Sequence, residues 1–191
     1  MQCIARFLVG LTAFGSVACG PTIDLRRPLC FVTNVTSQRS TTAAQQGAAA
    51  WLAPLGQATG QDFPAPRIVA EPRDCRGANP PIVMRTTCGR RNPVGVIYVR
   101  RSIRGYEVFL NEQTGGFLRG VSAHEIGHAL IGWKHVTRRP SLMNPYLGDA
   151  RPTPRDLELL CSRHHEVRRC RFSTTPDQPL TPTTEATLLR R

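Results

Sequence analysis

The sequence predicts an α+β domain, because helical and strand-forming segments occupy separate parts of one short chain. Residues 41–55 place Ala44, Trp51 and Leu55 at helical intervals. Residues 94–111 are instead rich in Val, Ile, Tyr and Phe, which favour strands. A length of 191 residues accommodates one ordinary domain. We therefore expect a single core of helices packed on a sheet.

The predicted strands lie between the first helix and the middle of the chain. Residues 67–70 are a short strand candidate, and residues 94–103 and 106–111 are predicted to form a hairpin or two adjacent strands. Residues 74–92 are rich in Pro and contain two Cys. We expect that stretch to be irregular.

Two further helices are predicted in the second half. One spans residues 117–131, after a Gly-Gly pair. The other begins at Thr153, which can cap a helix, with Pro154 at the first helical position and Asp156 where the helix dipole favours an anion.

Residues 1–18 have the pattern of a secretion signal. Arg6 precedes an apolar run that ends at Ala18 and has a second small residue at Ser16. This run is shorter than the roughly 20 residues that span a bilayer. Residues 16–20 also resemble a bacterial lipobox, in which Cys19 would be the lipidated residue. We expect a secreted, extracellular or periplasmic protein, with lipid anchoring to the cell envelope as the alternative.

These features divide the chain into four predicted parts. They are a signal peptide at residues 1–18, an N-terminal linker at 19–40, a folded domain at 41–171 and a disordered tail, rich in Thr and Pro, at 172–191.

The cysteines indicate an oxidising compartment. Of the 7 cysteines, Cys3 would leave with the signal, so an even number remains for disulfides. Short loops favour Cys75 with Cys88 and Cys161 with Cys170, although six cysteines allow about fifteen pairings. Lipidation of Cys19 would leave an odd number instead.

The net charge of +12 is spread along the chain. Lys134 is the only lysine among 25 basic residues, and no basic stretch is interleaved with aromatic residues. We therefore expect no specific nucleic-acid binding. The charge favours a solvated surface or loose contact with anionic envelope polymers.

The chemistry is concentrated in His124-Glu125-Ile126-Gly127-His128. Residues four apart lie on one helix face, so His124 and His128 can bind one zinc ion. Glu125 lies about 100° further round the helix. A carboxylate there can take a proton from water at the open position of the metal.

The run HEIGHALIGWKHV, from His124 to Val136, resembles the metzincin zinc motif HExxHxxGxxH, especially that of the matrixins. The sequence SLMNP at residues 141–145 is similar to the Met-turn of that family. The resemblance implies a zincin-like fold, with a twisted mixed sheet and about three helices. It also implies that Met143 supports the metal site, and that Pro145 and Tyr146 follow in the wall of the substrate pocket. A packed surface position for Tyr146 is the alternative.

The motif departs from the family at one point. Gly132 and His135 each stand one residue later than the family spacing. The glycine ends the helix in a left-handed conformation and lets the chain turn back, so that His135 is expected to be the third ligand. The competing third ligands are Glu158 and Asp149.

Histidine positions limit the number of metal sites. No His precedes the motif, and Glu107 and Glu112 are the only acidic residues between residues 90 and 117. We therefore expect one catalytic Zn²⁺ and no structural zinc or calcium. His164 is expected to be packed and His165 to be exposed.

The resemblance implies a monomeric zinc-dependent metalloendopeptidase that acts on proteins or peptides. Zinc-activated water would attack the peptide bond, with Glu125 as general base. Two alternatives stay open. One is a catalytically silent zinc-binding envelope protein, and the other is a basic module that binds envelope polymers. Membrane contact is expected only through a lipid at the N-terminus.

The signal predicts where the exported chain begins. We expect the exported protein to start at or next to Cys19, because the apolar run ends at Ala18. Mass spectrometry of protein from its native host measures this. An added diacylglyceryl mass on Cys19 would establish lipidation, whereas an intact Met1 would contradict the signal assignment.

Overall fold

The computed structural model describes residues 20–33, 37–89, 94–113, 119–133, 135, 141–144 and 151–167. These residues form an α+β fold, as predicted from the sequence. The main elements in chain order are β1 (Cys30–Val32), α1 (Gln38–Thr59), β2 (Arg67–Val69), β3 (Pro81–Thr87), β4 (Gly95–Arg100), β5 (Gly105–Asn111), α2 (Arg119–Ile131) and α3 (Pro154–Arg163).

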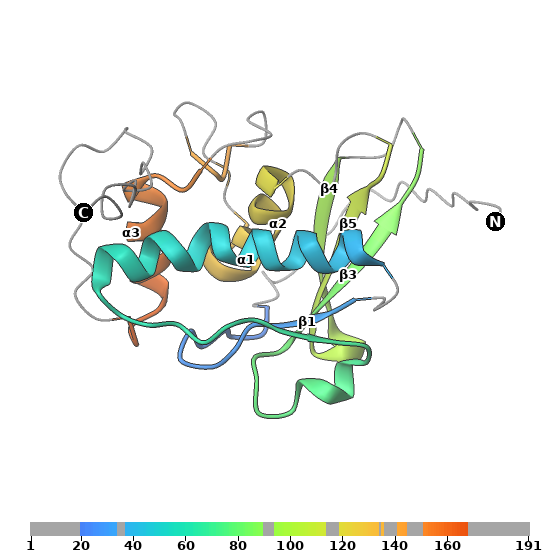
Figure 1. Ribbon diagram of the computed structural model, residues 1–191, viewed down its shortest axis with the longest axis horizontal. Helices are drawn as coiled ribbons and strands as arrows, with labels where there is room; N and C mark the ends of the chain where they lie inside the picture. Colours follow the sequence, from blue (N-terminus) through green and yellow to red (C-terminus); the bar gives the residue numbers. More distant parts are fainter. Residues whose placement is uncertain are drawn as a thin grey trace, which may run out of the picture.

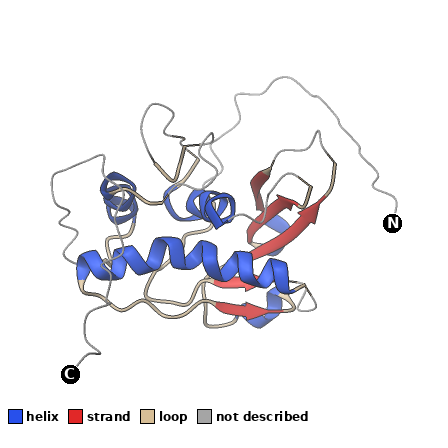
Figure 2. Ribbon diagram, turned by 45° about the horizontal axis from the view of Figure 1, so that its top comes forward, coloured by secondary structure: helices blue, strands red, loops and turns tan. Residues whose placement is uncertain are grey.

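The five strands form one mixed sheet in the order β2-β1-β3-β5-β4. The first four are parallel neighbours, and β4 pairs antiparallel with β5. Helix α1 runs along the molecule across the strands, with α2 beside it (Figure 1). Figure 2 shows α1 extending over the strands, with α2 and α3 grouped beyond it. The hairpin predicted from residues 94–111 is confirmed as β4 and β5.

The strand β3 corrects the expectation that residues 74–92 are irregular. Its first four residues are all buried, so it lacks the polar alternation by which a half-buried strand is recognised. Pro81 stands at the first strand position, where the missing N–H is tolerated. A proline therefore marks the start of this strand rather than a loop.

The predicted linker at residues 19–40 also needs correction. Residues 20–33 contribute β1 and the buried side chains of Ile23, Leu25 and Leu29 to the core. Strand β1 lies between β2 and β3 in the sheet. Its three residues are too few to show the alternation of polar and apolar residues that marks a strand. This segment of the sheet therefore resembled a linker in the sequence.

Helix α1 packs closely against α2 through small residues. A Cβ on Gly47 would lie 2.5 Å from Ile126 Cδ1 and 3.1 Å from Ser122 Oγ. The indole of Trp51, which is fully buried, donates a hydrogen bond of 2.8 Å to the carbonyl of Ala123. These contacts fix the residue that directly precedes His124.

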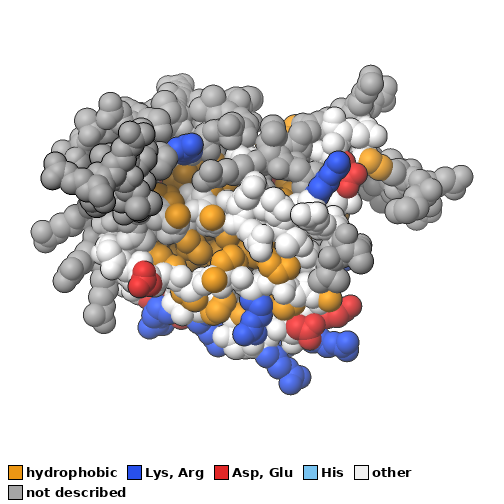
Figure 3. Space-filling view, viewed as in Figure 1, with side chains coloured by type: hydrophobic (Ala, Val, Ile, Leu, Met, Phe, Trp, Pro, Cys, Tyr) orange, Lys and Arg blue, Asp and Glu red, His pale blue; other side chains and the backbone are white. Residues whose placement is uncertain are grey.

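The surface distribution of charge agrees with scattered basic residues. On the face shown in Figure 3, the described Arg side chains along the lower edge are interspersed with Asp and Glu. Arg26, for example, forms an exposed ion pair of 2.9 Å with Asp24. Within the residues that the structure describes, no helix is both long and apolar enough to cross a membrane.

The predicted Cys75–Cys88 disulfide is wrong, because Cys75 is bonded to Cys30. The sheet brings β1 next to the turn at Pro72–Cys75, which follows β2, so a pair distant in sequence replaces the short loop. Cys88 and Cys161 also form disulfides. Cys170 lies outside the described residues, so the Cys161–Cys170 pair stays a prediction.

The Cys30–Cys75 disulfide should contribute substantially to stability. It closes a sequence separation of 45 residues, for which loop-closure entropy corresponds to about 4 kcal/mol. Replacing both cysteines by alanine should lower the free energy of unfolding by about that amount, as measured by urea denaturation. Non-reducing peptide mapping that joins Cys75 to Cys88 would contradict the assignment.

Candidate metal centre

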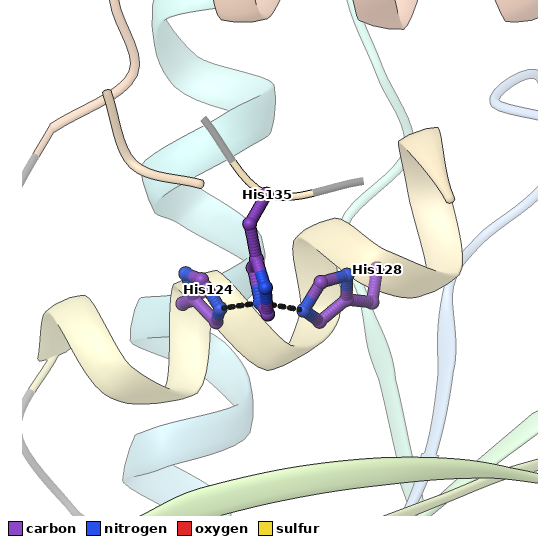
Figure 4. A group of neighbouring side chains, drawn as sticks. All are labelled: His124, His128 and His135. Carbon is purple, nitrogen blue, oxygen red and sulfur yellow. Dashed lines mark hydrogen bonds between the residues drawn. The ribbon is translucent and has the colours of Figure 1, made fainter. Parts of the chain in front are cut away.

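Helix α2 presents two imidazoles on one face. His124 and His128 are one turn apart, and their ring centroids lie 4.8 Å from each other. Figure 4 shows both rings directed to the same side of the helix. Because α2 is anchored by α1 on its other side, this pair is held by the core rather than by a surface loop.

His135 completes the group from beyond the end of α2. The helix ends at Ile131, and Gly132 has φ of +97°, so the chain reverses there. In Figure 4 the side chain of His135 points down between the other two rings. Its Nε2 atom lies 3.1 Å from His124 Nε2 and 3.1 Å from His128 Nε2. The three residues between His128 and Gly132 thus belong to α2, and the chain reverses directly after them.

The three nitrogens are close enough together to share one metal ion. The ligand atoms of His124, His128 and His135 all lie within 4.8 Å of one another. Zinc–nitrogen bonds of about 2.0–2.1 Å at the tetrahedral angle place ligand nitrogens about 3.3 Å apart. The two contacts of 3.1 Å are close to that value. These residues are therefore positioned to hold a metal ion.

Hydrogen bonds to backbone carbonyls orient two of the rings. His124 Nδ1 donates to the carbonyl of Leu142 at 2.8 Å, and His128 Nδ1 donates to that of Gly132 at 3.0 Å. A carbonyl accepts but cannot donate, so the proton of each neutral ring lies on Nδ1. Each Nε2 therefore directs a lone pair at the site. Such outer partners raise ligand basicity and fix the tautomer.

Burial favours the neutral form of these imidazoles. Loss of solvent lowers the pKa of His128 to about 4, and it also lowers the pKa of His124. Neighbouring imidazoles add to both shifts. Near pH 7 both rings are then neutral, and a metal ion would not have to displace a proton from either Nε2.

A buried aspartate holds the loop that orients His124. Asp156, on α3, accepts hydrogen bonds from Ser141 Oγ at 2.6 Å and from the backbone N–H of Leu142 at 3.1 Å. The same carboxylate accepts from the backbone and hydroxyl of Thr153, which completes the predicted helix cap. One carboxylate thus both starts α3 and positions the carbonyl of Leu142.

Met143 lies beneath the metal-binding helix. Its side chain is fully buried, and a Cβ on Gly127 would lie 2.6 Å from its sulfur atom and 2.6 Å from the Trp51 ring. Gly127 therefore lets Met143 and Trp51 approach the backbone of α2 between the two ligands. The structure thus packs Met143 against α2, and its role in supporting a metal site stays a prediction.

Glu125 is buried beside the ligands and packs towards β4. A Cβ on Gly95 would lie 2.8 Å from Glu125 Oε1, so the glycine leaves room for the carboxylate. Burial raises the pKa of Glu125 to about 7. A dication held by the three imidazoles would instead favour the ionised carboxylate.

The competing ligands do not join this group in the described residues. Glu158 is exposed on α3 and is not part of the histidine cluster. Asp149, Pro145, Tyr146 and Cys19 lie outside the described residues, so those assignments stay predictions.

The remaining two histidines lie where the sequence predicted. His164 is buried, with Nε2 at 2.9 Å from the carbonyl of Leu130, whereas His165 is exposed. His164 therefore serves packing and hydrogen bonding in the core.

Several residues around the site were not identified from the sequence. Asp156 was predicted only to interact favourably with the dipole of its own helix. The carbonyl of Leu142 belongs to the backbone, so no residue type in the sequence indicates its role. Trp133 stacks on His128, with ring centroids 5.7 Å apart and planes inclined by 19°. The sequence could have indicated this contact. Trp133 stands between the glycine that ends the helix and His135, so its ring has few places to pack other than beside the histidines.

No family model and no curated protein matches this chain.

Gly132 should be intolerant of a side chain. Its φ of +97° disfavours alanine, and a Cβ would lie 2.8 Å from Arg163 Nη2. Gly132→Ala should lower the free energy of unfolding by about 2 kcal/mol or more and weaken zinc binding. Urea denaturation and competition with a chelating dye measure these effects.

Gly60 provides the matched control. Its φ is +65°, but no atom lies within 4 Å of the position of an added Cβ. Gly60→Ala should cost only about 1 kcal/mol of stability and leave zinc affinity unchanged. Equal effects of the two substitutions on zinc affinity would show that the Gly132 turn does not position the ligands.

Proposed function

We propose that this chain is a zinc-dependent endopeptidase of the metzincin type, with a zincin-like fold. The observation that carries the proposal is the convergence of three Nε2 atoms, with His135 at 3.1 Å from both helical ligands and with Glu125 as the next residue after His124. A set of three histidines leaves the fourth position open, which is typical of catalytic rather than structural zinc sites.

The donor set fits zinc, which when bound supplies a water of lowered pKa and polarises a carbonyl. The residues of the chain supply the proton transfers. Glu125 accepts a proton from the attacking water and then donates it to the leaving amine nitrogen. Its burial excludes bulk water from that transfer. Positioned acid–base groups of this kind contribute about 10²–10⁴-fold to rate.

Strand β4 is the element best placed to align a peptide. It is an edge strand of the described sheet, and Gly95 at its start adjoins Glu125. An extended peptide could pair with this edge through its backbone, which would bring successive peptide bonds past the carboxylate. Such recognition depends little on side chains and suits protein or peptide substrates.

The cysteines and the N-terminus support a secreted or periplasmic setting. A buried disulfide at Cys30–Cys75 is favoured in an oxidising compartment. The signal-like residues 1–18 and Cys19 lie outside the described residues, so secretion, lipid anchoring and the monomeric state remain part of the proposal.

Two substitutions should separate catalysis from metal binding. Glu125→Gln should lower kcat/KM for a cleaved peptide by about 10²-fold or more, with unchanged zinc content, because the carboxylate serves the water. His135→Ala should abolish cleavage and weaken zinc binding by more than the roughly 10–100-fold lost with an outer partner. Peptide-library cleavage and elemental analysis measure both.

His165→Ala is the matched control, because this histidine is exposed and lies outside the cluster. It should change neither cleavage nor zinc content. Normal zinc affinity in His135→Ala, with loss of zinc in Glu158→Ala, would show that the third ligand is wrong. Zinc-loaded protein that cleaves no peptide would favour the silent zinc-binding alternative. Salt-sensitive polymer binding that survives chelation would favour the basic module.

A further inference from the structure

A cavity of about 250 Å³ adjoins the metal centre on the side of the glycine turn. Its polar and aromatic wall includes His128 of α2, Tyr106 of β5 and Arg163 of α3. Trp133 and His164, which follow α2 and α3, complete this wall, and residues 20–23 line the remaining side. Its volume is below the roughly 300–1,000 Å³ of typical ligand pockets. It therefore suits one side chain or chain end rather than a whole cofactor.

Most polar groups in the wall are already engaged within the protein. His128 donates from Nδ1 to Gly132, and the Tyr106 hydroxyl donates to the carbonyl of Pro21 at 2.9 Å. His164 uses both ring nitrogens, on Leu130 and on Glu166. These groups shape the cavity but offer few free donors to a ligand.

Arg163 is the exception. Within the described part of the chain its guanidinium makes no hydrogen bond and no ion pair, and no Asp or Glu is among the described residues that line the cavity. A guanidinium has five N–H donors and stays charged at any physiological pH. Among the described residues, no acidic side chain of the cavity wall pairs with this positive charge.

The glycine turn determines where this charge lies. A Cβ on Gly132 would lie 2.8 Å from Nη2, 3.0 Å from Cζ and 3.2 Å from Nη1 of Arg163, so the guanidinium rests against the bare backbone of Gly132. The carbonyl of the same residue accepts from His128. One residue thus positions both a metal ligand and the neighbouring cation.

The cavity can be reached from solvent. Arg163 is exposed, and Trp133 is 44% exposed while its ring stacks on His128. An indole face beside a guanidinium fork provides an apolar wall for methylene groups and a bidentate partner for a carboxylate.

We propose that this cavity is a substrate subsite that binds a carboxylate of the peptide through Arg163. The proposal rests on the proposed peptidase function and makes Arg163 a specificity-determining residue. The carboxylate has two possible sources, an acidic side chain or the free C-terminus of the peptide. The site chemistry is the same for both, and the test distinguishes them.

The first arm of the test uses cleavage by the zinc-loaded protein. Paired peptides differ only by Glu or Gln at each position, or by a free or amidated C-terminus. In one of these peptide pairs, the peptide with the carboxylate should be cleaved with a kcat/KM about tenfold higher or more than its uncharged counterpart. A charged hydrogen bond between the carboxylate and Arg163 accounts for a difference of this size. Arg163→Gln should remove this ratio without changing zinc content, and Arg163→Glu should favour Lys at that position.

Arg155→Gln is the matched control. Arg155 is also exposed on α3, but it lies about 12 Å away along the helix axis. The same loss of charge there should preserve the preference for the carboxylate. A wild-type protein without any such preference, or an Arg163→Gln variant that keeps it, would overturn the proposal.

The second arm does not depend on cleavage. Trp133 is one of only 2 tryptophans, and Trp51 is fully buried, so Trp133 fluorescence reports occupation of the cavity. The probes are N-acetyl-glutamate α-amide, N-acetyl-glutamine α-amide and N-acetyl-alanine with a free carboxylate, with Trp133→Phe as the optical control. Binding of either acid probe about tenfold tighter than the glutamine amide, lost in Arg163→Gln, would support the subsite.

The two arms separate the two proposals. If no peptide is cleaved but an acid probe binds through Arg163, the proposed peptidase function fails and the carboxylate site stands. If peptides are cleaved but the acid and amide probes bind equally, the peptidase function stands and the carboxylate site is wrong.

Discussion

The metal centre depends on the close contact between α1 and α2. Gly47 on α1 and Gly127 on α2 remove side chains where the helices and the Met143 loop meet. Trp51 fills the remaining space and donates to the carbonyl of Ala123, directly before the first ligand. Protein cores are packed so tightly that even one added methylene is felt. The two imidazoles on α2 are therefore held by the closely packed core of the fold.

The hydrogen bonds that orient His124 and His128 come from different parts of the chain, so the histidine cluster depends on several elements of the domain. His124 is oriented by the loop at residues 141–144, and Asp156 on α3 holds that loop. His128 is oriented by the end of its own helix. A buried carboxylate such as Asp156 is costly unless its lone pairs are satisfied, and here Ser141, Leu142 and Thr153 satisfy them. Loss of α3 would therefore disturb the loop at residues 141–144 and, through it, the orientation of His124.

The sequence was most informative where a residue pattern has a local physical cause. The helical spacing of His124 and His128, the cap at Thr153 and the hairpin at residues 94–111 all follow from rules that act over a few residues, and the structure agrees with them. The errors concern long-range partners. Cys75 pairs with Cys30 because parallel strands adjoin, and β1 and β3 are strands because neighbours complete their hydrogen bonds. Carbonyl acceptors such as that of Leu142 leave no trace in side-chain patterns, so the orientation of His124 could not be predicted.

The turn at Gly132 determines where the chain goes after the end of α2. In an uninterrupted helix, each further residue advances about 1.5 Å along the axis. His135, seven residues after His128, would then lie about 10 Å further along the helix and away from the cluster. The positive φ of Gly132 reverses the chain instead, and the reversal places His135 over the two helical ligands. The same reversal exposes the Gly132 carbonyl to His128 and its bare Cα to Arg163. A single backbone conformation therefore links the position of His135 to that of the Arg163 guanidinium, so that the histidine cluster and the charge of the adjoining cavity depend on the same turn.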